Sequence, residues 1–339
     1  MSNQPPVIEV NIGGKVPADD VFEIEALQDI DQPDMCSVVL SNIKGERSQQ
    51  TKEGTAFTVT ADGKKLFEGE VTGIEPVFDH NMPTRVAVRG LNKMHKLTRG
   101  RKSRTFEKMT DQDIVKKVAS ESGLSAQCDG DPAIKHDHVY QHNQTDLEFI
   151  LQRAKRIDFE VRVEGSKLLF QKRKTDGSGT KLVWGDGDGE LERFRPRISG
   201  ANQVKKVVVH GWDPKKKEKI VGEASMSVEL GGQQPKAEAE TVETERPVYS
   251  KEEADALAKS ILKDRQMNYV TGEALTLGNP ALKAGTTVDI DVHDPKFDGK
   301  YYIKSCVHRY IHSVAGVDGV AHREAGYRTL LKLRRDSSG

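Results

Sequence analysis

Cysteine is scarce in this sequence, with three widely separated residues, Cys36, Cys128 and Cys306, among 339 and no CxxC pair. This excludes a disulfide framework and a zinc finger and is typical of a chain that folds in a reducing compartment. Long apolar runs are also missing, and the N-terminal segment has neither a basic nor an apolar stretch, which argues against a membrane span or a signal peptide. We therefore expect the chain to be made and folded in the cytosol.

An excess of charge of one sign is absent as well. Lys and Arg together number 52, as do Asp and Glu, so the net charge is zero. A balanced chain creates no global field that would draw it onto DNA or an anionic membrane. We expect no membrane binding by the folded protein, and nucleic-acid binding only where a local basic patch supports it.

The common signatures of enzymes and nucleotide-binding proteins are missing too. The sequence contains no GxGxxG, GxxxxGK[ST], GxSxG or HExxH motif, and so lacks the usual phosphate cradles, the nucleophile elbow and the zinc-protease helix. Paired carboxylates for glycoside cleavage stay open, because their separation in space decides that chemistry. The prediction is a protein that is not an enzyme and carries no cofactor.

One cluster has the residue types of a metal site. His136 and His138 would lie on one face of a strand, with His142 four residues later and Cys128 upstream. The same stretch also reads as a polar strand leading into a helix cap at Thr145. We expect the strand and no metal, with these four residues as the candidate ligands if a metal is bound.

The first hundred residues predict strands separated by Gly, Asp, Asn and Pro turns, with no helix that could make parallel crossovers. Residues 1–104 should form a first antiparallel β-barrel domain with a tube-like shape. The alternating runs are 7–12, 21–27, 35–40, 56–60, 66–74 and 85–91.

A different pattern begins near residue 105. Thr110 and Thr145 open capping boxes before two amphipathic helices, and 159–163 and 167–171 read as a hairpin. Residues 105–178 should therefore form a small α/β module. Strands resume over 179–339 and predict a second tube-like β-barrel domain, with a helix at about 250–267 capped by Ser250 and an exposed loop at 231–246.

Two basic runs stand out in the sequence. The first comprises Arg99, Arg101, Lys102 and Arg104, and the second comprises Lys215, Lys216, Lys217 and Lys219. We interpret the lysines as a solvated turn, and the first run as a set of subunit-contact candidates because arginine suits interfaces better than lysine.

The ordered set of motifs resembles the phage late control gene D family over nearly the whole chain. The strongest segment is Gln141–Ile150, and others are Val88–Asn92, Thr98–Arg101, Val207–Pro214, Gly278–Gly285 and Gly299–Ile303. That family provides the baseplate hub of contractile phage tails and the hub-like N-terminal part of the VgrG spike proteins of type VI secretion. The resemblance therefore implies a mainly β fold with α+β character.

The function implied by this resemblance is structural. A homotrimer with two barrel domains per chain would form a pseudo-sixfold ring that seats a hexameric inner tube on a trimeric spike, and ring closure would cover sheet edges. Because the sequence stops at Gly339, where spike-bearing relatives continue, it resembles a stand-alone hub with a separate spike protein. Its implied partners are the inner tube protein, that spike and other baseplate or tail proteins.

The implied location is the cytoplasm during assembly and then a virion or phage-tail-like particle, with nucleic acid only in transit through the lumen. Two alternatives belong to other classes. A tail-associated cell-wall hydrolase would need a metal site or an acid pair facing a groove, and a nucleic-acid-binding module would need salt-dependent affinity for DNA.

Overall fold

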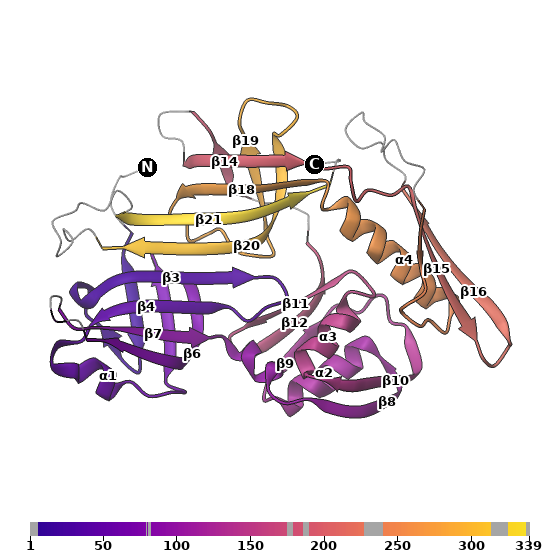
Figure 1. Cartoon of the computed structure of the whole chain (residues 1–339), viewed down its shortest axis with the longest axis horizontal. Helices are drawn as coiled ribbons and strands as arrows, with labels where there is room; N and C mark the ends of the chain where they lie inside the picture. Colours follow the sequence, from indigo (N-terminus) through magenta and orange to yellow (C-terminus); the bar gives the residue numbers. More distant parts are fainter. Residues whose placement is uncertain are drawn as a thin grey trace.

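The computed structural model describes residues 6–78, 80, 83–174, 179–185, 190–226, 240–312 and 325–336 (Figure 1). Strands dominate these residues, and the expected mainly β fold with α+β character is confirmed. None of the described helices combines the length and the apolar character that crossing a membrane requires.

One sheet of 13 strands runs through both β regions of the chain. From one edge, its first part consists of β14 (Leu191–Ile198), β18 (Val270–Leu277), β21 (Gly326–Arg335) and β20 (Gly299–Ile311). It continues through β3 (Val21–Asp29), β4 (Met35–Ser41), β7 (Arg85–Leu91) and β6 (Lys64–Val77). Beyond β6 lie β5 (Ala56–Ala61), β1 (Ile8–Ile12) and β2 (Lys15–Val16), and β19 (Thr287–Asp291) joins β13 (Lys181–Val183) to β20.

This continuity corrects the expectation of two separate barrels. β20 pairs antiparallel with β3, from Ser305 opposite Asp29 to Ile311 opposite Glu23. The strand path stays open among the described residues and closes into neither barrel. Alternation in sequence predicts which face of a strand is buried, but it does not select the neighbouring strand. In the structure, β3 and β20 pair their backbone N–H and C=O groups with each other.

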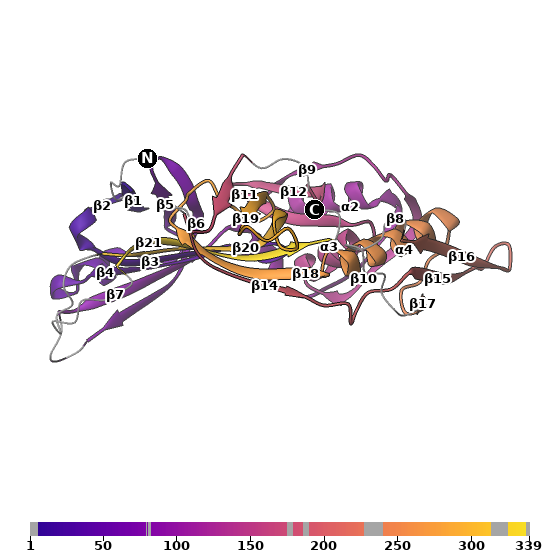
Figure 2. The same ribbon diagram turned by 90° about the horizontal axis from the view of Figure 1, so that it is seen from above.

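The main sheet is covered on one face. Viewed from above, β1, β2, β5 and β19 lie on the same side of the layer formed by β3, β20, β21 and β18 (Figure 2). Two apolar clusters fill the space between. The first contains Ile24, Val38, Phe57, Phe67 and Val88, and the second contains Leu182, Ile290, Tyr301, Ile303 and Leu331.

The α/β module has its own core. Its strands are β8 (Lys102–Thr110), β9 (Ser125–Cys128), β10 (Lys135–Gln144), β11 (Phe159–Glu164) and β12 (Lys167–Lys172), and its helices are α2 (Asp111–Glu121) and α3 (Asp146–Ala154). Both predicted capping boxes are confirmed, at Thr110 with Asp113 and at Thr145 with Glu148. The predicted hairpin is confirmed as β11 and β12. The division of the chain at residues 104 and 178 stays a prediction.

A further lobe consists of β15 (Lys206–Asp213), β16 (Glu218–Ser225), β17 (Glu240–Glu243) and α4 (Lys251–Gln266), which Ser250 caps in the expected range. The expected loop at 231–246 needs a partial correction. Residues 231–239 lie outside the described residues, but Glu240–Glu243 forms β17, parallel to β15. Polar composition suggested a loop there, yet this strand covers the second edge of β15. Short helices complete the described fold: η1 (Ala18–Asp20), η2 (Ile43–Gly45), α1 (Glu46–Gln50) and η3 (Lys93–Thr98).

A buried histidine lies beside the junction of β3 with β20. His308 is 1 % exposed, and its two ring nitrogens lie 2.7 Å from Tyr327 Oη and 3.1 Å from Leu282 O. A neutral imidazole satisfies both contacts, donating from Nε2 to the carbonyl and accepting the tyrosine hydroxyl at Nδ1. Burial lowers the pKa of His308 to about 4.

We predict that this histidine destabilises the fold in acid. The folded pKa lies below the ordinary value of about 6.5, so its contribution is complete above pH 6.5 and falls by about 3 kcal/mol as the pH drops toward 4. Urea unfolding at pH 7.5 and pH 4.5 should therefore show a smaller loss for His308→Gln, which does not titrate, than for the wild type. Equal losses in the two proteins would contradict the prediction.

Candidate functional site

The four candidate metal ligands do not come together. His136 is buried on β10, whereas His138 and His142 are exposed on the same strand and Cys128 ends β9. The ring of His142 lies against Tyr140, with 5.5 Å between centroids. Among the residues that the structure describes, no group of His, Cys, Asp and Glu side chains is arranged to hold a metal ion.

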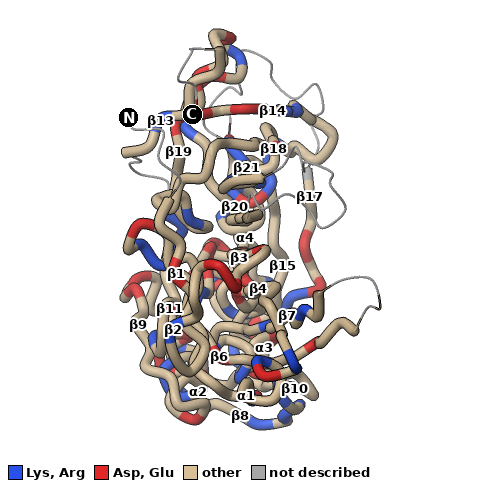
Figure 3. Tube along the Cα trace, turned by 90° about the vertical axis from the view of Figure 1, so that its left-hand side faces the viewer, with Lys and Arg blue, Asp and Glu red and all other residues tan. Residues whose placement is uncertain are grey.

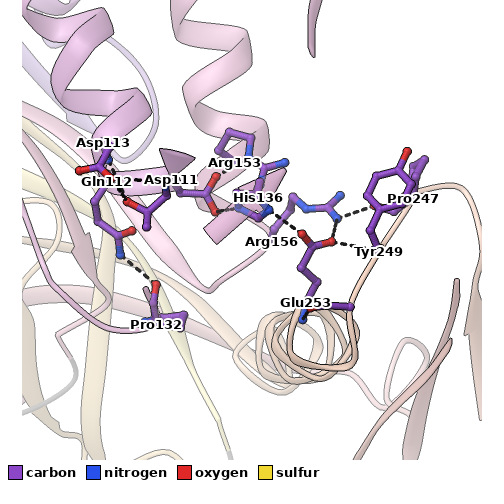
Figure 4. Close-up of polar contacts among 12 residues, drawn as sticks. Asp111, Gln112, Asp113, Pro132, His136, Arg153, Arg156, Pro247, Tyr249 and Glu253 are labelled. Atoms are coloured by element: carbon purple, nitrogen blue, oxygen red, sulfur yellow. Dashed lines mark hydrogen bonds and ion pairs between the residues drawn. The ribbon is translucent and has the colours of Figure 1, made fainter. Parts of the chain in front are cut away.

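His136 instead belongs to a buried ionic network, drawn in Figure 4. Its Nδ1 lies 2.5 Å from Glu253 Oε1, and its Nε2 lies 3.2 Å from Asp111 Oδ2. Arg153 Nε donates to Asp111 Oδ1 at 2.5 Å, and Arg153 Nη2 lies 2.8 Å from His136 Nε2. The Arg153 guanidinium contacts both the Asp111 carboxylate and the His136 imidazole. These two side chains are therefore not available as ligands for a metal ion.

Electrostatics favours the charged form of each member. Burial opposes the imidazolium, but hydrogen bonds to Asp111 and Glu253 outweigh it and raise the pKa of His136. Burial likewise opposes both carboxylates, yet the contacts with His136, together with Arg153 near Asp111, lower the pKa values of Asp111 and Glu253. Two cations and two anions therefore balance within the network.

The ionic network joins two parts of the molecule. Asp111, His136 and Arg153 come from α2, β10 and α3 of the α/β module, whereas Glu253 lies in the first turn of α4. All four residues are at most 8 % exposed, so none is open to a substrate. The arrangement fixes α4 against the module. No local sequence pattern signals this network, because His136 and Glu253 are 117 positions apart.

The arginine-rich segment makes contacts within its own chain. Arg104 Nη2 and Lys102 Nζ reach Asp146 at 2.8 and 2.6 Å, near the start of α3. Arg101 Nη2 lies 3.2 Å from Glu148, and Arg99 Nη2 lies 3.0 Å from His95 Nε2. Arg99 and Arg101 remain exposed. A subunit-contact role for this segment stays a prediction.

An eight-strand portion of the main sheet, from β14 to β6, has two edges without a strand partner among the described residues. There β14 pairs with β18 alone, and β6 pairs with β5 no further than Glu70, so that the second half of β6 is an open edge beside β7. Pro196 on β14 and Pro76 on β6 are compatible with such edges, since proline cannot donate to a ladder. Arg193, Arg195 and Arg197 are exposed on β14 and have no ion-pair partner among the described residues.

No described element covers the face of this portion that points away from the two apolar clusters, and we call it the open face. Figure 1 looks onto it, and no helix crosses in front. Six partly exposed apolar side chains lie in register across it, one on each of six adjacent strands. They are Leu275, Leu330, Val307, Leu27, Met35 and Leu91. None belongs to the described hydrophobic cores, so this row is a candidate contact surface.

We predict that the ionic network carries a large share of the stability of the α4 contact. Glu253→Gln keeps the size of the side chain but removes the closer of the two carboxylates that face His136, and breaking a buried ion pair costs about 3 kcal/mol or more. Glu252→Gln is the matched control, because Glu252 is exposed on the same turn. Chemical denaturation should give a lower midpoint for Glu253→Gln alone. Coinciding midpoints for the two variants would refute this role.

Comparisons with solved structures identify proteins of the same fold. The tail protein from Neisseria meningitidis MC58 matches with a TM-score of 0.75 at 14 % identity, covering 98 % of this chain and 97 % of that one. The 43 kDa tail protein of prophage MuSo2 from Shewanella oneidensis matches with a TM-score of 0.73 at 16 % identity, covering 97 % and 98 %.

A third match is the E. coli c3393 protein, described as a type VI secretion component with structural similarity to the T4 tail proteins gp27 and gp5. Its TM-score is 0.62 at 13 % identity, and the match covers 96 % of this chain and 76 % of that one. A search of curated proteins found no match.

The family comparison matches residues 56–312 with the Alg8 N-terminal domain. This match does not test the resemblance to the late control gene D family, which stays a prediction at that level of detail. Since the matched residues span more than half of the sequence, the chain belongs to the Alg8 N-terminal domain family.

Proposed function

We propose that this protein is a structural component of a contractile tail or injection machine, and that it acts as a non-enzymatic baseplate hub. Two observations support the proposal: the fold is similar to that of phage tail proteins and of a type VI secretion component, and a single sheet spans both β regions with two edges, at β14 and at the second half of β6, that have no strand partner among the described residues. The second observation carries the most weight, because two such edges suit repeated head-to-tail contact.

The sheet suggests how the ring would close. The β14 edge of one protomer would pair with the β6 edge of the next, and the β14 arginines would face the side that bears Glu75. Within the portion from β14 to β6, four strands lie on either side of the β3–β20 junction, so three chains supply six four-stranded units. Six units match the symmetry of a hexameric tube, and three chains match the symmetry of a trimeric spike.

The orientation of the sheet in such a ring follows from its layers. The covered face carries the two apolar clusters and, over them, β1, β5 and β19. This additional layer needs more room, and the outer side of a ring has the larger circumference. The open face would therefore line the channel. Figure 3 shows Lys and Arg interspersed with Asp and Glu along the trace, a pattern compatible with passage of nucleic acid without capture.

The remaining assignments belong to the same proposal. The partners would be the inner tube protein, a separate spike and other tail proteins, and the location would be the cytoplasm during assembly and then a virion or related particle. No specific observation favours either alternative, the cell-wall hydrolase or the nucleic-acid-binding module. The candidate metal ligands of a hydrolase are separated, and the chain as a whole has no net positive charge to attract nucleic acid.

We predict that the purified chain forms a trimer, alone or with spike or tube protein, and that the β14 edge is needed for it. Arg195→Glu should weaken trimerisation at least about tenfold, since a like charge at an interface costs a few kcal/mol. Lys332→Glu is the matched control, because Lys332 lies in the same cross-strand row as Arg195 but inside the sheet.

The measurement is native mass over a concentration series, for the wild type and both variants, with and without spike or tube protein. A monomeric wild type under every condition would overturn the trimer. Equal weakening by both substitutions would overturn the role of the β14 edge.

A further inference from the structure

An aromatic groove lies on the lobe formed by β15, β16, β17 and α4, away from the two sheet edges. Trp212 near the end of β15 and Tyr249 just before α4 are 55 % and 57 % exposed. They line a shallow groove of about 360 Å³ together with Pro214, Pro247 and Val248. Two exposed aromatic side chains beside two prolines make an apolar surface that the core does not use.

The wall of this groove is held in place by the ionic network. Glu253 Oε2 accepts a hydrogen bond from Tyr249 N at 3.0 Å, and Pro247 O accepts one from Arg156 Nη2 at 2.6 Å. Val248 packs onto Gly211 of β15, where a Cβ atom would lie 2.4 Å from Val248 Cγ2. The groove is therefore preorganised, which lowers the conformational entropy that the protein must lose when a ligand binds.

The two exposed aromatic side chains of the groove each carry a hydrogen-bond donor. Within the described part of the chain, neither the Trp212 indole N–H nor the Tyr249 hydroxyl has a partner. β17 ends at Glu243 opposite Val209, so among the described residues no third strand accompanies β15 from His210 onward. Free donors between apolar walls suit a ligand that offers carbonyl oxygens and needs few acceptors for its own N–H groups.

The turn beside the groove is basic. Lys215 pairs with Asp137, but Lys216, Lys217 and Lys219 have no carboxylate within ion-pair distance among the described residues. Lys219 is the cross-strand neighbour of Trp212 and so lies on the same face. This surplus of cations complements an acidic ligand.

We propose that this groove binds an extended, proline-containing acidic segment of a partner protein. A polyproline II segment is already extended, presents solvated carbonyls and lacks N–H groups at its prolines. Such segments dock between aromatic side chains. Acidic residues at its flanks would meet the lysines of the β15–β16 turn. The proposal goes beyond the hub function and does not depend on it, since ring closure uses β14 and β6.

The two tryptophans of the chain make the test direct. Trp184 lies beside β13, so Trp184→Phe leaves Trp212 as the only fluorophore of its kind and reports on the groove alone. In this background the full chain is titrated with a synthetic peptide of repeated Glu-Pro-Pro units. Peptides of repeated Lys-Pro-Pro and Glu-Ala-Ala units test the need for the acid and for proline.

We expect a saturable change in Trp212 emission with the Glu-Pro-Pro peptide, and binding at least about tenfold weaker with each of the other two. Tyr249→Ala should weaken binding of the Glu-Pro-Pro peptide at least about tenfold, as for a central interface aromatic. Lys219→Glu should weaken that peptide and strengthen the Lys-Pro-Pro one, which a merely unfolded groove would not do.

Three outcomes would overturn the proposal: no saturable change with any peptide, equal affinity for all three peptides, or unchanged affinity in Tyr249→Ala. Unfolding midpoints of the variants establish that the lobe is intact. The result leaves the hub proposal unaffected, because the native-mass experiment tests different strands.

Discussion

The rest of the structure depends on the pairing of β3 with β20. An unpaired strand presents a row of backbone N–H and C=O groups that burial would leave unsatisfied. Here two strands separated by about 280 positions satisfy each other over seven register pairs. Because of this junction the two β regions share one sheet, one open face and one apolar row. The edges at β14 and at the second half of β6, which have no strand partner among the described residues, lie on opposite sides of this junction.

A second constraint is the cost of burying charge. Asp111, His136, Arg153 and Glu253 would each be expensive to bury alone, but every one of them has an opposite charge from another element within reach. This requirement fixes where α4 docks on the α/β module. Glu253 also accepts a hydrogen bond from the backbone N–H of Tyr249, just before α4. The ionic network therefore helps to fix the shape of the aromatic groove.

The open face balances contact against aggregation. Its apolar row crosses six strands, yet charged rows run on either side, including Arg195, Glu273 and Lys332 on one and Arg309, Glu25 and Arg89 on the other. Exposed charges and prolines near strand edges discourage unwanted pairing. A chain with two free edges can thus stay unpaired until a specific partner edge arrives.

The sequence alone determined the local elements of this protein. Capping residues marked the starts of α2, α3 and α4, and alternation marked most strands, because both signals depend on neighbours within a few positions. It also indicated the mainly β class. Tertiary structure alone decided which strands pair, why Arg104 turns to Asp146, and how His136 meets Glu253. Periodicity tells which side of an element is buried, but the partner that buries it lies anywhere along the chain.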